Sequence, residues 1–121
     1  MNRKEHETLI SKASRRLARE FGGAFPFVYI CPVGGCADNA KSWSAQVSYV
    51  VDLAGANATI TSTAEHADPQ AAMDAAFDGI PAALTRRRLM RVEELRAEAT
   101  YLDQKATSIR ATADELERSC R

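Results

Sequence analysis

The residues best suited to chemistry are two cysteines in segment 31–36, which has the sequence Cys-Pro-Val-Gly-Gly-Cys. A cysteine pair binds zinc when a second Cys or His pair completes four ligands. The other candidates, His6, His66 and Cys120, have no matching spacing, so no metal and no cofactor are expected. A disulfide or redox-active pair stays open for Cys31 and Cys36, and two free thiols at a strand end are favoured.

Two further motifs could take part in a reaction. The Gly34-Gly35 pair lacks the Lys-Ser/Thr of a phosphate loop and the strand-to-helix pattern of a dinucleotide site. Glu65-His66 could act in acid–base catalysis, but no Ser or Cys nucleophile is spaced with it. An exposed loop histidine is therefore favoured, and we predict that the chain is not an enzyme.

The composition is that of one globular domain with an appendage. The 121 residues are 45% hydrophobic and 26% charged, which excludes collagen-like and disordered chains. No apolar run approaches the ~18–20 residues that a membrane span requires. The charged N-terminus is not a signal peptide, and three cysteines are too few for a secreted disulfide scaffold. A cytoplasmic protein without a membrane partner is expected.

The charges are distributed unevenly although 16 basic and 16 acidic residues cancel. Residues 1–20 carry a net charge of +3, residues 21–84 carry −5, and residues 85–121 carry +2. The acidic middle segment is a candidate surface for a protein partner. Its acidic residues are Asp38, Asp52, Glu65, Asp68, Asp74 and Asp78.

Hydrophobic periodicity predicts an α+β fold. Strand 43–52 shows the clearest alternation, and strand 25–31 is an unbroken aromatic and β-branched run, which predicts burial on both faces. We expect an N-terminal helix at 5–20 and an antiparallel three-stranded meander with strands at 25–31, 43–52 and 57–64. A second helix at 68–79 and a long C-terminal helix at 82–119 follow. Residues 1–84 then form a small domain and residues 85–121 a helical dimerisation arm.

Local signals mark the helix boundaries. Gly22-Gly23 ends the first helix, and Asp68-Pro69 starts the second with a side-chain cap followed by a proline that needs no amide hydrogen. Gly79 and Pro81 predict a kink or break near residue 79. Residues 82–119 contain neither Gly nor Pro, so a continuous helix is expected there.

A heptad repeat is the most specific pattern in the chain. Small residues occupy the a positions and large ones the d positions through four heptads, which predicts close packing against a second helix. The seam consists of Val92, Leu95, Ala99, Leu102, Ala106, Ile109, Ala113 and Leu116, with Cys120 at the next a position.

The charges beside the seam favour an antiparallel partner. A parallel dimer pairs Arg91 with Arg96, Glu98 with Asp103 and Lys105 with Arg110, all repulsive. An antiparallel pair centred near Gln104 instead joins Glu98 to Lys105, Arg96 to Glu117 and Asp103 to Arg110. The simplest partner is a second copy of the chain. An intramolecular hairpin with helix 5–20 is the alternative.

The basic cluster has two interpretations. Its arginines, Arg86, Arg87, Arg88 and Arg91, could contact phosphates. In an antiparallel dimer they would instead lie beside the partner helix's acidic C-terminal end, where the helix dipole favours positive charge. This structural role is favoured.

The order helix–three strands–helix over residues 5–84 resembles a double-stranded-RNA-binding domain. That family binds phosphates through lysines at the start of its last helix. The corresponding stretch 68–74 has two acids and no Lys or Arg, so RNA binding by that mode is not expected. In size and style the chain also resembles small accessory proteins of phages and mobile elements, a class that includes inhibitors of bacterial defence systems.

The function predicted from sequence is a non-enzymatic, dimeric protein-binding module. As an inhibitor or adaptor it would present its acidic surface to a nucleic-acid-handling protein. The alternative is nucleic-acid binding through Arg86–Arg91 and the basic N-terminal helix. A small ligand held near Trp43 and Tyr49 is a third interpretation.

Overall fold

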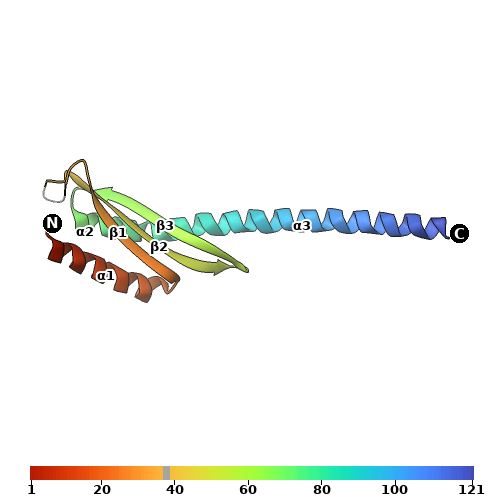
Figure 1. Ribbon diagram of the computed structural model, residues 1–121, viewed down its shortest axis with the longest axis horizontal. Coiled ribbons are helices and arrows are strands. Elements are labelled where there is room, and N and C mark those ends of the chain that lie inside the picture. The colour runs from red at the N-terminus through yellow and green to blue at the C-terminus, as the bar shows by residue number, and fades with distance from the viewer. Residues whose placement is uncertain (37–38) are drawn as a thin grey trace. The chain divides into compact units, whose positions relative to one another are not determined.

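The described residues form six elements in the expected order (Figure 1). The structure is a computed structural model and describes residues 1–36 and 39–121. The elements are α1 (Arg3–Phe21), β1 (Ala24–Val33), β2 (Ser42–Leu53), β3 (Ala56–His66), α2 (Pro69–Asp78) and α3 (Ile80–Ser119). The chain divides into two compact units, Met1–Arg87 and Arg88–Arg121. The fold is α+β, as the periodicity predicts.

The three strands form one antiparallel sheet in the order β1-β2-β3. Val47 of β2 lies opposite Val28 of β1 and Ser62 of β3, which fixes the register. The β2–β3 hairpin turns at Ala54 and Gly55, whose φ angles of 53° and 85° match the two-residue turn that suits twisted strands. This turn joins the two strands expected at 43–52 and 57–64.

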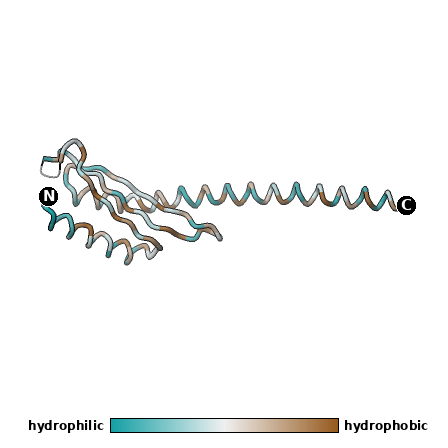
Figure 2. The backbone as a smooth tube through the Cα atoms, in the orientation of Figure 1, coloured by the Kyte–Doolittle hydropathy of each residue, from teal (hydrophilic) through white to brown (hydrophobic). Residues whose placement is uncertain are grey.

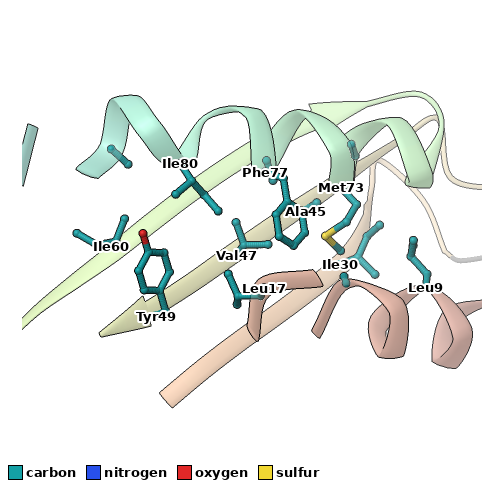
Figure 3. Close-up of a cluster of buried hydrophobic side chains, with 14 of the residues drawn as sticks. Leu9, Leu17, Ile30, Ala45, Val47, Tyr49, Ile60, Met73, Phe77 and Ile80 are labelled. Atoms are coloured by element: carbon teal, nitrogen blue, oxygen red, sulfur yellow. The ribbon is translucent and has the colours of Figure 1, made fainter. Parts of the chain in front are cut away.

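One face of the sheet carries the core of the first unit. α1 covers β1, while α2 covers β2 and β3, on the same face. Figure 3 shows Leu17 of α1 and Phe77 of α2 directed toward Val47 of β2. The buried core is Leu9, Ala13, Leu17, Ile30, Trp43, Ala45, Val47, Tyr49, Ile60, Ala72, Met73, Ala76, Phe77, Ile80 and Ala83.

The expectation that strand 25–31 is buried on both faces is wrong. Phe25 is 82% exposed, and Phe27 and Tyr29 are each about half exposed, whereas Ile30 is buried. The reason is that both helices cover one face, so alternate residues of the edge strand β1 lie on the open face. There Phe27 stacks on Tyr29 with ring centroids 6.2 Å apart.

The helix boundaries confirm the local signals. Asn2 caps α1 by accepting a hydrogen bond from the Glu5 N–H at 2.8 Å, and Gly22 ends the helix in the left-handed region. Asp68 caps α2 by accepting from the Ala71 N–H at 2.9 Å. The predicted break falls at Gly79, between α2 and α3.

Two glycines are required for close packing rather than for unusual backbone angles. Gly79 has a right-handed backbone conformation, but a Cβ there would collide with Oγ of Ser62 on β3. A Cβ on Gly23 would likewise collide with the Tyr49 ring. At both positions a helix terminus approaches the sheet so closely that only glycine fits.

The second unit is the continuation of α3 beyond Arg87. The whole of α3 is one helix of 40 residues, which confirms the uninterrupted helix expected from the lack of Gly and Pro. Apolar residues recur along it at regular intervals (Figure 2). Ile80 and Ala83, at its start, are buried in the core of the first unit.

Candidate interaction surfaces

The second unit exposes a regular apolar stripe. The large seam residues Val92, Leu95, Leu102, Ile109 and Leu116 are between 38% and 63% exposed. They lie on one helix face because heptad a and d positions recur every 3.5 residues on average. Monomeric proteins rarely expose so long a row of large apolar side chains. The stripe therefore indicates a protein interface on α3.

The seam alternates small and large residues in a way that depends on orientation. When a second copy runs antiparallel about Gln104, each a position faces a d position. Ala99 then faces Ile109, Ala106 faces Leu102 and Ala113 faces Leu95, so these layers each hold one small and one large side chain, while Val92 faces Leu116 at the ends. A parallel pair instead stacks alanine on alanine and leucine on leucine in alternate layers. Even filling of the layers favours the antiparallel pair, independently of charge.

Charged side chains flank this stripe, and some of them already form local ion pairs. Arg91 Nη1 lies 3.2 Å from Glu94 Oε2, and Arg121 Nη2 lies 2.9 Å from Glu117 Oε1. Glu98 and Lys105, predicted to pair between copies, are both exposed. Exposed pairs contribute only ~0–1 kcal/mol each, so they select an orientation more than they stabilise it.

The arginine cluster falls at the boundary of the two units. Arg86 and Arg87 belong to the first unit and Arg88 and Arg91 to the second. Arg86 and Arg88 are exposed, while Arg87 and Arg91 are half-buried. All four arginines lie within the helix α3.

The acidic residues do not gather on one surface. Asp52 and Glu65 belong to opposite ends of the β2–β3 ladder, paired with Asn57 and Ser44, which puts them roughly 26 Å apart at ~3.3 Å per residue. Asp78 is exposed in the last turn of α2. The predicted residue Asp38 lies outside the described residues.

Most of these carboxylates have local structural roles. Asp52 accepts from the Gly55 N–H at 2.8 Å, and Asp68 caps α2. Glu65 accepts from Ser42 Oγ at 2.8 Å. Asp74 accepts from Gln70 at 3.0 Å and lies 3.4 Å from the Arg16 guanidinium. These contacts within the chain explain why acidic residues stand at these four positions, without a binding partner.

The three cysteines are free thiols. Cys31 is half-buried on the open face of β1, and the Cys36 thiol donates to Asn39 Oδ1 at 3.1 Å. A hydrogen bond with the Cys31 side chain is the main cause that raises the pKa of the Tyr29 phenol above its ordinary value. Within residues 1–36 and 39–121, no three His, Cys, Asp or Glu side chains are grouped to hold a metal ion.

His66 is exposed, but it is the last residue of β3 rather than part of a loop. Its ring Nδ1 accepts a hydrogen bond from the Asp68 N–H at 3.0 Å, which helps to set the connection into α2. Trp43 and Tyr49 are buried in the core, and Tyr49 stacks on Phe21 at 5.8 Å. The side chains of His66, Trp43 and Tyr49 therefore each have a structural role in the first unit.

Sequence reasoning missed one exposed surface, the aromatic edge formed by Phe25, Phe27 and Tyr29. The alternation of Phe27 and Tyr29 with Val28 and Ile30 was the available signal, since period-two spacing places these two rings on one face. Phe25 lies beyond an irregularity of the strand and has a positive φ of 51°, so the same spacing does not place it. The aromatic content of the segment instead suggested complete burial.

No helix of the described chain combines the length and apolarity that crossing a bilayer requires. Comparisons with protein-family models, with curated proteins and with solved structures find no match to this chain.

Proposed function

We propose that this protein is a non-enzymatic binding module that self-associates through α3 to display two copies of its N-terminal unit. The exposed seam from Val92 to Leu116 carries the proposal. Its 25 residues extend over about 36 Å of helix at ~1.5 Å per residue, enough for a continuous two-helix interface. The occupant of the seam is a second copy of the same chain.

The N-terminal helix does not compete for this seam. Leu9, Ala13 and Leu17, which form the buried apolar stripe of α1, lie in the core of the first unit. An intramolecular hairpin would have to expose them, with a cost of roughly 1.5–3 kcal/mol for each large side chain. A second copy therefore covers the seam better than α1 of the same chain.

The non-enzymatic part of the proposal is supported by the surroundings of the candidate reactive groups. The His66 ring is engaged with the backbone of Asp68, and Cys36 with Asn39. Neither arrangement joins a nucleophile to a base and an orienting group, which is the pattern that nucleophilic catalysis requires. The module therefore acts through binding.

Measurement of the mass in solution tests self-association. Between 1 and 100 μM, sedimentation equilibrium is expected to give twice the mass of one chain, with dissociation on dilution. The measurement does not require low salt, because apolar burial rather than charge supplies most of the free energy of association. A single-chain mass at 100 μM, or a trimer, would contradict the proposal.

A further inference from the structure

The exposed face of α1 is strongly basic. At 100° per residue, Lys4, Lys12, Arg15, Arg16 and Arg19 fall within an arc of about 120°, which adjoins the arc of the buried Leu9, Ala13 and Leu17 on the Leu9 side. From the first to the last, this row, here called the α1 cation row, extends for about 22 Å at ~1.5 Å per residue. The cation row therefore borders the buried face of α1, and all of its members except the half-buried Arg16 are exposed.

A groove runs along one side of the cation row. Its volume is about 420 Å³, and Lys4, Thr8 and Lys12 line it on the α1 side, with Gln70 on the α2 side. The remaining lining is Asn2, Glu5 and Leu9. Amide, hydroxyl and ammonium groups all donate hydrogen bonds to anionic oxygens. Glu5, the one acid in the lining, accepts from the Asn2 side chain at 2.8 Å.

The cations differ in how firmly the protein engages them. The Arg16 guanidinium lies 3.2 Å from Glu20, 3.4 Å from Asp74 and 4.2 Å from the centre of the Phe77 ring. Arg19 lies 3.9 Å from Glu20. Lys4, Lys12 and Arg15 have no ion pair among the described residues. Three of the five cations therefore face solvent without a carboxylate.

The chemistry of this surface selects one kind of partner. Protein interfaces are held by buried aromatic and apolar anchors, and the cation row presents none, since Leu9 is only 7% exposed. Phosphate backbones are instead bound by rows of Lys and Arg supported by polar donors. We infer that the α1 cation row and its groove bind the phosphodiester backbone of a nucleic acid, without sequence preference.

This site does not depend on the pairing of α3, because all of its residues lie in the first unit. It also differs from the Arg86–Arg91 cluster. With four phosphates contacted, the dissociation constant for duplex DNA is on the order of 10–100 μM at 50 mM salt, with a log–log salt slope of about −3.6.

Fluorescence anisotropy with a labelled 16-base-pair duplex and a labelled 16-nucleotide single strand tests the inference. The full chain is compared with the variant Lys4→Gln/Lys12→Gln/Arg15→Gln, whose glutamines keep the helix propensity of α1. The matched control, Arg86→Gln/Arg88→Gln/Arg91→Gln, removes the same charge from α3. Circular dichroism establishes that all three proteins are folded.

The α1 variant is expected to lose at least 100-fold in affinity at 50 mM salt and to flatten the salt slope to about −1. The control is expected to stay within about fivefold of the original chain. Equal losses in both variants, or no binding by the original chain at 50 mM salt, would overturn the inference. So would tighter binding of a labelled 15-residue polyglutamate, which would make the partner an acidic polypeptide.

Discussion

Replacement of Leu102 by aspartate is expected to convert the paired chain into monomers. Leu102 lies at the centre of the seam, and pairing of two copies would bury it against Ala106 of the second copy. The variant places one carboxylate in each of two apolar layers and removes two leucines per dimer, each worth roughly 1.5–3 kcal/mol when fully buried. The dissociation constant should rise by more than 100-fold, measured by sedimentation equilibrium.

Tyr101→Asp provides the matched control. Tyr101 is the neighbouring residue and is 60% exposed, but it lies outside the a and d positions of the heptad. The Tyr101→Asp substitution introduces a carboxylate on the same helical turn as Leu102→Asp. Effects on helix stability or on net charge should therefore appear in both variants. If Tyr101→Asp dissociates the dimer as strongly as Leu102→Asp, the seam is not the interface.

Replacement of Phe77 by alanine is expected to destabilise the first unit by about 3–5 kcal/mol. Phe77 is only 2% exposed, and its ring lies 6.3 Å from Phe21 and beneath the Arg16 guanidinium. The substitution leaves a cavity between α1, α2 and the sheet. Because total stabilities of small domains are about 5–15 kcal/mol, this variant retains little of its margin.

Trp43 makes this effect measurable for the first unit alone. It is the single tryptophan of the chain and is buried, so its fluorescence reports unfolding of that unit. With a urea m-value of about 1 kcal/mol per M, the midpoint should fall by about 3–5 M. The control Leu116→Ala, at an exposed position of α3, should leave the Trp43 midpoint unchanged. A Phe77→Ala midpoint within 0.5 M of the original, a threshold of about 0.5 kcal/mol, would contradict the described core.

Much of the fold follows from short-range signals in the sequence. The Asp68-Pro69 cap, the Gly22 terminus and the alternation of strand 43–52 depend on local backbone chemistry, and the structure confirms each of them. The exposure of Phe27 could not be predicted in this way. It depends on how many helices cover the sheet, and that is a property of the whole fold.

Some of the candidate surfaces could likewise be predicted from the sequence, and others could not. The exposed apolar stripe on α3 depends only on helical periodicity, so the sequence was sufficient to name its residues, and its use as a dimer interface stays a prediction. The sequence also indicated a basic N-terminal helix, whereas the groove beside its cations could not be predicted, because Gln70 of α2 completes it. The acidic residues suggested a common surface because net charge ignores position, whereas the structure places Asp52 and Glu65 far apart.

The orientation of the paired helices is tested most directly by cysteine cross-linking between differently substituted chains. In a background with Ser at positions 31, 36 and 120, one chain carries Val92→Cys and another, with a mass tag, carries Leu116→Cys. Antiparallel pairing about Gln104 puts residue 92 of one copy opposite residue 116 of the other, within reach of a disulfide. Oxidation should therefore cross-link the mixture and neither chain alone. Cross-linking of each chain with itself, and none between the two, would contradict antiparallel pairing.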